Sequence, residues 1–333
     1  QLGTDMRLKN KWESDSKQYL RYHLKQMIHS VIYGLAIGDA LGVPVEFNDR
    51  DSYQILDMVG YGIYNQPAGT WSDDTSLSLA LIEHLCEDSD LNELMDKFVA
   101  YRQGYLTPFG YCFDIGVATN QAIERYLAGV SPEKCGGTSE RDNGNGALMR
   151  ISPLALLLHE NFDFSYRSKI IEQYTKLTHA HPRSIVASIL YVQFLIGFLL
   201  NIRLEKLLCQ SKPYFEDYFK KKPEYWKEYQ EHFRELFDQD FYQKSREEIT
   251  STGYVVDTLK ACLWCLGTTK NFEEAVLKAV NLGEDTDTIG AITGSLAGAI
   301  YKLECIPERW IEKLANRSLL EEKCHQLLEY MDK

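Results

Sequence analysis

Two stretches of the chain, far apart in the sequence, each place a glycine at every fourth position. The six residues are Gly34, Gly38, Gly42, Gly290, Gly294 and Gly298. A glycine inside a soluble helix costs about 1 kcal/mol relative to alanine, so three in each of two helices need a compensating reason. Residues four positions apart share one face of a helix. We therefore predict that two helices touch backbone to backbone at the centre of the fold.

Helical periodicity extends over most of the 333 residues. Apolar residues recur three and four positions apart, and convincing strand-like alternation is absent. The composition, 44% hydrophobic and 25% charged, is that of a globular protein rather than a disordered chain. We predict an all-α fold. The expected helices cover residues 19–42, 73–87, 91–103, 114–128, 147–159, 165–177, 182–200, 203–209, 222–238, 251–268, 271–281, 287–302, 307–314 and 317–331.

Four segments depart from this background. Residues 43–70 and 129–146 carry turn-forming residues, and long irregular segments in a helical domain usually have a function. Residues 211–245 are rich in aromatic side chains with nearly balanced charge, which predicts an amphipathic helix pair packed on the core. The polar first 20 or so residues predict an N-terminal extension over residues 1–24, followed by one compact catalytic domain over residues 25–333.

Charge and cysteine content exclude several classes of protein. With 36 Lys and Arg against 48 Asp and Glu, the net charge of −12 argues against a general nucleic-acid or membrane binder. The longest apolar run, residues 185–200, is short for a membrane span and predicts a core helix. Eight cysteines are scattered, and the single CxxC, Cys262 to Cys265, lacks the partners of a zinc site. We expect a cytoplasmic protein with reduced thiols.

Two loop-to-helix junctions are crowded with short oxygen-bearing side chains, residues 72–75 (SDDT) and 285–288 (DTDT). Helix capping explains one such residue at each junction, but not neighbouring carboxylates without Lys or Arg close by in the sequence. Hard oxygen ligands without Cys or His favour Mg²⁺, Mn²⁺ or Ca²⁺. If the junctions converge, they offer enough oxygen atoms for two divalent ions.

Three further segments could complete such a site. Glu46 follows the first glycine helix, where a carboxylate beside a metal-activated water could act as acid or base. Residues 143–146 (NGNG) precede a predicted helix, so their backbone N–H groups could bind phosphate. His179 could stack on a ligand or form a hydrogen bond to it. Taken singly, each has an ordinary structural alternative: a surface glutamate, a turn before a helix, and a structural histidine.

Together these segments resemble the ADP-ribosylglycohydrolase family, the relatives of the dinitrogenase reductase-activating glycohydrolase. They occur in the family's order across roughly residues 28–303. The matching stretches are GLAIGDALGVPVEF (34–47), GTWSDDTSLSLAL (69–81), FDIGVATNQAI (113–123), NGNGALMRISPLAL (143–156), LTHAHPRSIVAS (177–188), STGYVVDTL (251–259) and NLGEDTDTIGAITGSLAGAIY (281–301).

The resemblance implies an all-α fold around a cleft that holds two Mg²⁺ ions, with Mn²⁺ as an alternative. The implied metal ligands are Ser72, Asp73, Asp74, Asp285, Asp287 and Thr288. The implied carboxylates near the reacting ribose are Glu46 and Asp114. The implied ADP-ribose-binding residues are Asn145, Gly146, His179 and Tyr254. Two departures are Ser72, where the family often has threonine, and residues 138–143, which differ from several relatives.

The implied activity is removal of ADP-ribose from a modified protein side chain. The segments around residues 38–46 and 251–259 look more like the arginine-directed branch than the serine-directed one. An alternative is an immunity protein that neutralises an ADP-ribosylating toxin, partly by occluding it through residues 1–24, although that extension could simply be a packing helix. A descendant with a dead site is disfavoured, because all six implied ligand positions carry oxygen side chains.

Overall fold

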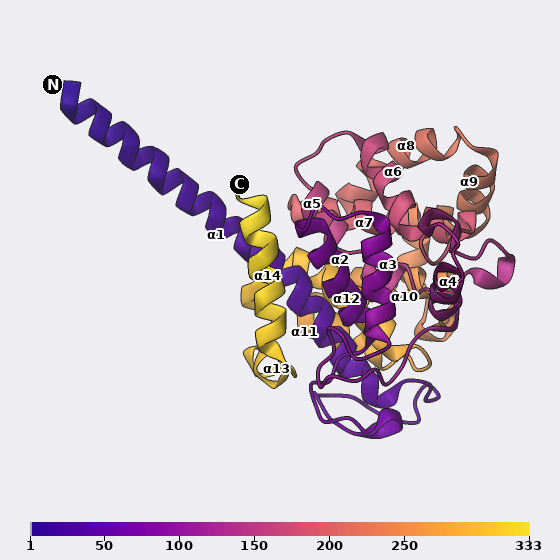
Figure 1. The fold of residues 1–333 in the computed structure, drawn as a ribbon. Coiled ribbons are helices and arrows are strands. Elements are labelled where there is room, and N and C mark those ends of the chain that lie inside the picture. Colours follow the sequence, from indigo (N-terminus) through magenta and orange to yellow (C-terminus); the bar gives the residue numbers. More distant parts are fainter. Residues whose placement is uncertain (1) are drawn as a thin grey trace.

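The computed structural model describes residues 2–333 and confirms the all-α prediction (Figure 1). Among the described residues, extended structure is limited to three isolated bridge pairs. The α-helices are α1 (Leu2–Gly42), α2 (Asp73–Cys86), α3 (Leu91–Tyr101), α4 (Val117–Leu127), α5 (Pro153–Leu158), α6 (Phe164–Thr175), α7 (Pro182–Leu199), α8 (Leu204–Phe219), α9 (Pro223–Glu228), α10 (Val255–Gly267), α11 (Phe272–Val280), α12 (Thr286–Tyr301), α13 (Glu308–Lys313) and α14 (Arg317–Met331).

The centre of the fold is the antiparallel pair α1 and α12. A Cβ atom added at Gly38 would lie 1.8 Å from the carbonyl oxygen of Gly290, and one at Gly34 would lie 2.2 Å from that of Gly294. These distances are far below van der Waals contact, so only residues without a side chain let the two backbones approach so closely. The predicted contact between the two glycine helices is confirmed.

This crossing brings the C-terminal end of α1 next to the N-terminal end of α12. A Cβ added at Gly42 would lie 2.3 Å from the carbonyl oxygen of Thr286, in the first turn of α12. Helix α2 joins them because Asp39 of α1 accepts hydrogen bonds from the backbone N–H groups of Ser72 and Thr75, at 2.8 and 3.3 Å. The N-terminal ends of α2 and α12 are therefore held at one point.

Most predicted helices are present, but four predictions were wrong in extent. Helix α1 begins at Leu2 rather than at residue 19, and α8 continues to Phe219. The predicted helix 147–159 is a 3₁₀ turn followed by the short α5, because Pro153 lacks an N–H group and starts a new helix. The predicted helix 222–238 is α9, then one π-helical turn and one 3₁₀ turn.

The interior contains the apolar and aromatic segments as predicted. The most apolar 18-residue windows of Gly3–Val45 and Pro182–Leu199 are apolar enough to cross a membrane, but they are 100% and 94% buried within the protein. Helices α8 and α9 and the turns after them add buried aromatic rings, with Phe215 and Phe219 stacked 6.1 Å apart. Both regions therefore serve as core, as the amphipathic patterns predicted.

The first part of α1 projects away from the body of the protein (Figure 1). Residues 3–15 are all exposed. Helix α14 accompanies α1 only as far as Arg21, which forms ion pairs with Glu329 and Asp332 near the end of the chain. The predicted extension, of which Gln1 lies outside the described residues, is thus continuous with the central helix. We call residues 3–20 the arm.

Candidate metal and substrate site

A cleft of about 380 Å³ opens between the first turns of α2, α4 and α12 and the segment 141–146. This volume is in the range of small-ligand sites. Its walls carry seven carboxylate side chains but little positive charge. The ionisable lining residues are Glu46, Asp73, Asp74, Asp114, Arg141, Asp142, His179, Asp285 and Asp287.

The structure brings the two acidic junctions together in this cleft. Carboxylate oxygens of Asp74 and Asp287 lie within 4.8 Å of each other and of Asp39. Asp287 also belongs to a second group of the same width, with Glu46 and Asp285. Each of these two groups of side chains could hold one cation, and the two positions would be neighbours because both groups include Asp287.

The helix starts position these carboxylates. The hydroxyl of Ser72 accepts a hydrogen bond from the backbone N–H of Asp74 at 3.3 Å and so caps α2. Asp285 immediately precedes α12, but its carboxylate does not cap that helix; it accepts a hydrogen bond from the side-chain amide of Asn145 at 2.7 Å. The partial positive charge at a helix N-terminus favours carboxylates there, but it amounts to only about half a charge per helix.

Burial and mutual repulsion oppose ionisation of these carboxylates. Burial, together with neighbouring Asp285, raises the pKa of Glu46 to about 9, and burial together with Asp114 raises that of Asp73 to about 7. Burial and nearby carboxylates also raise the pKa of Asp74. One buried oxygen of Glu46 and one of Asp74 have no hydrogen-bond partner. Such crowded carboxylates require protons or cations to neutralise them.

The chemistry of this site fits hard divalent cations. Carboxylate oxygens make up both groups, and neither group includes a histidine or cysteine from residues 2–333. The hydroxyl of Thr288 adds another oxygen beside Asp74. Mg²⁺, Mn²⁺ and Ca²⁺ prefer such oxygen ligands, whereas zinc and copper sites usually contain nitrogen or sulfur. The unpartnered oxygens of Glu46 and Asp74 are the atoms that a cation would satisfy.

Ser72 and Asp39 lie beside Asp74 at the start of α2. Ser72 is not among the residues that line the cleft, and its hydroxyl lies 2.7 Å from Asp39 and 3.1 Å from Asp74. Asp39 is fully buried and also accepts the Thr75 hydroxyl hydrogen bond at 2.7 Å. Sequence reasoning assigned Asp39 no role. The sequence could have indicated a role for Asp39, because it is the only charged residue in the apolar stretch 31–45.

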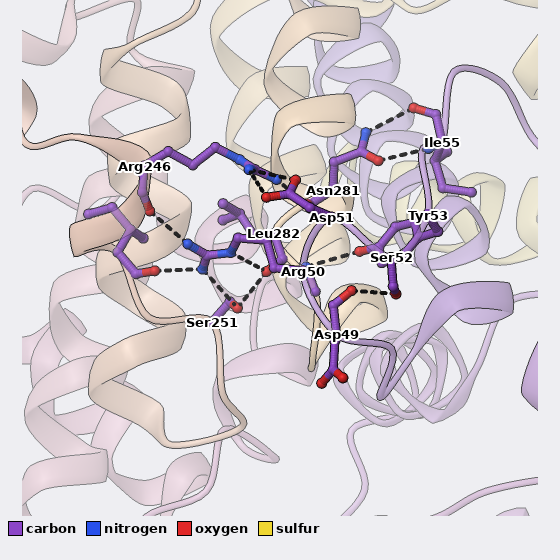
Figure 2. A network of polar contacts seen from close by, with 12 residues as sticks. Asp49, Arg50, Asp51, Ser52, Tyr53, Ile55, Arg246, Ser251, Asn281 and Leu282 are labelled. Atoms are coloured by element: carbon purple, nitrogen blue, oxygen red, sulfur yellow. Dashed lines mark hydrogen bonds and ion pairs between the residues drawn. The ribbon is translucent and has the colours of Figure 1, made fainter.

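The loop that follows Glu46 is tied to residues 281–282, which precede the second acidic junction, and to Arg246 and Ser251 (Figure 2). Within this loop, Arg50 donates hydrogen bonds to the backbone carbonyl oxygens of Leu282 and Ile249, at 2.7 and 2.6 Å. The backbone N–H of Phe47 donates a hydrogen bond to the carbonyl oxygen of Glu284, the residue before Asp285, at 2.7 Å. These contacts hold Glu46 beside the carboxylates of the second junction.

Asp114, the other predicted catalytic carboxylate, lines the cleft just before α4. Tyr64 donates a hydrogen bond to its carboxylate at 3.2 Å, and Tyr101 donates one to its backbone carbonyl oxygen at 2.6 Å. Burial raises the pKa of Asp114. The structure thus places Asp114 in the same cleft as Glu46.

Residues 143–146 connect the metal junction to His179. Asn145 donates to Asp285, and a Cβ atom added at Gly146 would lie 2.7 Å from Cε1 of the His179 ring. The expectation that this loop opens an α-helix is wrong, because a 3₁₀ turn over Leu148–Arg150 follows it. Any contact to phosphate therefore depends on N–H groups of the loop itself.

His179 is a neutral side chain in the cleft wall. Burial, aided by the positive charge of Arg150, lowers its pKa to about 3. Its Nδ1 atom lies 2.8 Å from the hydroxyl of Thr178, which also accepts a hydrogen bond from Arg150 at 2.7 Å. His179 can therefore form hydrogen bonds to a ligand but cannot offer it a positive charge.

Tyr254 is the predicted ligand-binding residue that does not line the cleft. Its backbone pairs with Gly144, but its hydroxyl accepts a hydrogen bond from Arg183 at 3.0 Å. Arg183 is in turn paired with Glu228 at 2.7 Å. The assignment of Tyr254 to ADP-ribose binding remains a prediction. Sequence reasoning assigned no role to four other polar lining residues, Thr119, Gln121, Arg141 and Asp142. Thr119 and Gln121 lie in the matching stretch 113–123, whereas Arg141 and Asp142 lie in the segment 138–143 that differs from several relatives.

Comparisons with known proteins agree with this architecture. The family model for ADP-ribosylglycohydrolase matches residues 21–333. The chain is 34% identical over 302 residues to "ADP-ribosylarginine hydrolase Tri1" of Serratia proteamaculans (strain 568), covering 89% of this chain and 77% of that protein. It is 31% identical over 297 residues to "ADP-ribosyl-[dinitrogen reductase] glycohydrolase" of Rhodospirillum rubrum, covering 84% and 87%.

The fold also matches a solved structure. A chain from an "ADP-ribosylglycohydrolase-related protein complex" superposes with a TM-score of 0.76 at 32% sequence identity. The match covers 93% of this chain and 99% of that chain, so it extends over the cleft and its supporting helices.

Proposed function

Because the chain belongs to the ADP-ribosylglycohydrolase family, we propose that it hydrolyses the bond between ADP-ribose and an arginine side chain of a modified protein. The arginine linkage is supported by two relatives, from Serratia proteamaculans and Pseudomonas putida, that are named ADP-ribosylarginine hydrolase.

The observation that carries the proposal is the convergence of the acidic junctions beside Glu46. We propose that two Mg²⁺ ions, or Mn²⁺ as an alternative, are bound there. Their ligands would come from Ser72, Asp73, Asp74, Asp285, Asp287 and Thr288. When bound, such ions supply Lewis-acid chemistry, which neutralises the carboxylates, orients ribose hydroxyls and makes water more acidic.

Glu46 and Asp114 are the residues that handle protons in this proposal. One of them accepts a proton from water as the water oxygen bonds to the anomeric carbon of the ribose, which has oxocarbenium character. The bond from that carbon to the guanidinium nitrogen breaks, and its electron pair stays on nitrogen. The carboxylic acid then returns its proton to that nitrogen, so the products are free ADP-ribose and an unmodified arginine.

Residues 143–146 and His179 would bind the diphosphate side of the substrate, away from the bond that is cleaved. The backbone N–H groups of Gly144 and Gly146 can donate to the diphosphate, whereas the N–H of Asn145 already donates to the carbonyl oxygen of Gly253 at 3.0 Å. Asn145 contacts Asp285 and so links this loop to the cation positions. His179 supplies a neutral hydrogen bond.

Release of ADP-ribose from arginine-modified and serine-modified protein tests the proposal. We expect release from the arginine-modified protein, loss of release after EDTA, and recovery with Mg²⁺. Equal release after complete chelation would refute the metal requirement. Release from the serine-modified protein alone would refute the arginine linkage.

The arm supports a second role. Leu8, Trp12 and Tyr19 of the arm lie on one face of α1 at helical spacing, and Trp12 is 72% exposed. We propose, as the alternative function, that the arm binds and occludes an ADP-ribosyltransferase toxin. Deletion of residues 2–20 should then weaken toxin binding without lowering hydrolase activity. Unchanged binding, or no binding by the full chain, would refute occlusion by the arm.

We also propose a cytoplasmic location. All eight cysteines are free, which is typical of a reducing compartment. Fractionation of cells that produce the protein should recover it with cytoplasmic enzymes, and recovery outside the cytoplasm would contradict this proposal.

A further inference from the structure

Among the described residues that line the cleft, Arg141 carries the only permanent positive charge. Seven carboxylates share the walls with it, and His179 is neutral because burial lowers its pKa to about 3. Two divalent cations would bring four positive charges to a wall that carries seven carboxyl groups. A diphosphate that entered this cleft would therefore lie among carboxylates, and Arg141 is the one lining side chain among the described residues whose permanent charge would attract it.

The guanidinium of Arg141 is available for a ligand. Within residues 2–333 it forms no hydrogen bond or ion pair. The two acidic residues beside it in sequence are engaged elsewhere: Glu140 lies 3.4 Å from Arg183, and the Asp142 carboxylate accepts hydrogen bonds from the N–H and hydroxyl of Ser139, at 2.9 and 2.8 Å. Arg141 is also exposed, so binding a ligand would break no internal contact.

Arg141 lies on the same cleft wall as the loop proposed to bind the diphosphate. It belongs to the 3₁₀ turn Glu140–Asp142, which leads directly into residues 143–146. Asn143 fixes this connection: its side chain donates to the Glu140 carbonyl oxygen at 3.1 Å and accepts a hydrogen bond from Ser184 at 2.8 Å. The guanidinium and the loop N–H groups thus belong to one braced segment.

We propose that Arg141 binds the diphosphate of the substrate and thereby makes the enzyme selective for ADP-ribosyl groups over ribosyl groups without phosphate. This inference rests on the proposed function, because it takes ADP-ribose as the ligand. A guanidinium can donate two parallel hydrogen bonds to phosphate oxygens, whereas an ammonium group acts as a single point charge. Arg141 is a binding residue in this account and takes no part in proton transfer.

Two substitutions and a matched control distinguish contact from general attraction. Arg141→Gln removes the charge, and Arg141→Lys keeps the charge but loses the paired donors. Lys134→Gln is the control, because Lys134 is an exposed cation of the same irregular segment that does not line the cleft. Lys134→Gln removes one positive charge from the protein, as Arg141→Gln does, but it removes no group that contacts the ligand.

The test is the dissociation constant of ADP-ribose for the full-length, Mg²⁺-loaded protein, measured by calorimetry, with kcat measured alongside. We expect Arg141→Gln to weaken ADP-ribose binding about tenfold while kcat changes less than twofold, and Arg141→Lys to fall between it and the wild type. Lys134→Gln should bind like the wild type.

Two results would overturn the inference: Arg141→Gln binding within twofold of the wild type, or equal weakening by Lys134→Gln. If the wild-type protein itself binds no ADP-ribose, the proposed function fails together with this inference. A wild type that binds ADP-ribose and an Arg141→Gln variant that binds it equally well would refute the role of Arg141 alone.

Discussion

Replacing Gly38 by alanine should force α1 and α12 apart at the point where they support the acidic junctions. The added Cβ would lie 1.8 Å from the carbonyl oxygen of Gly290, 2.3 Å from its carbonyl carbon and 2.9 Å from the backbone nitrogen of Ala291. Ordinary contact begins near 3.4 Å. All three atoms belong to the backbone of α12, so no side-chain rotation can relieve the clash, and the helices must separate by roughly 1.5 Å.

The cost follows from two opposing contributions. Overpacking a core typically costs 1–3 kcal/mol, and this clash with main-chain atoms belongs at the upper end. Alanine recovers about 1 kcal/mol because it is a better helix former than glycine. We therefore expect Gly38→Ala to lower the free energy of unfolding by about 2 kcal/mol.

Urea unfolding, followed by circular dichroism at the helix band, would measure this change. Gly3→Ala is a matched control, because Gly3 lies in the same helix and a Cβ there meets nothing within 4 Å. The control should be neutral or stabilising by up to about 1 kcal/mol. Equal stability of Gly38→Ala and the wild type would refute the backbone contact, as would equal losses in both variants.

Three further predictions concern ionisable side chains. Burial opposes ionisation of Glu83, but hydrogen bonds from Lys323 and Lys97 outweigh burial and lower its pKa to about 2. Ionised Glu83 therefore stabilises the fold above its ordinary pKa of about 4.5, and this contribution is lost as pH falls toward 2. In urea unfolding, Glu83→Gln should lower the free energy of unfolding by about 3 kcal/mol at pH 7 and by little at pH 2. A loss of stability that does not depend on pH would contradict this. Glu46→Gln should lower kcat by about 10²- to 10⁴-fold with little change in KM in steady-state assays; an unchanged kcat would exclude Glu46 from the chemistry. Asp74→Asn should abolish Mn²⁺ binding in calorimetry, and retained binding would contradict the role of Asp74 as a metal ligand. The same variant should stabilise the metal-free protein at pH 8, because burial raises the pKa of this carboxyl and makes its ionised form unfavourable in the fold.

The spacing of residues in the sequence was sufficient to predict contacts where a residue type is unfavourable unless it has a particular neighbour in the fold. Glycines four apart are unfavourable in a helix unless another backbone needs the space, so Gly38 and Gly290 indicated the α1–α12 contact. Adjacent carboxylates at helix starts are likewise unfavourable without a cation. The two acidic junctions therefore suggested a shared cation site on the condition that they converge, and the carboxylates of Asp74 and Asp287 do lie together.

Other features depend on three-dimensional contacts or on weak local preferences. Asp39 acts through hydrogen bonds to a distant helix, which its own neighbours in sequence do not reveal. Arg141 stands in an irregular segment outside any motif, and only the folded cleft makes it a lone cation. Helix α1 continues to Leu2 because residues 4–33 contain neither proline nor glycine, although the arm has no apolar face packed on the core.

The most direct test of the paired-cation site is crystallography with Mn²⁺. Anomalous difference maps from crystals soaked in Mn²⁺ should show two neighbouring peaks between the N-terminal ends of α2 and α12, with Asp287 contacting both. The Asp74→Asn variant should lose at least one peak. Absence of Mn²⁺ from this cleft in the wild-type protein, with the ion bound elsewhere or not at all, would contradict the site on which the proposed hydrolysis depends.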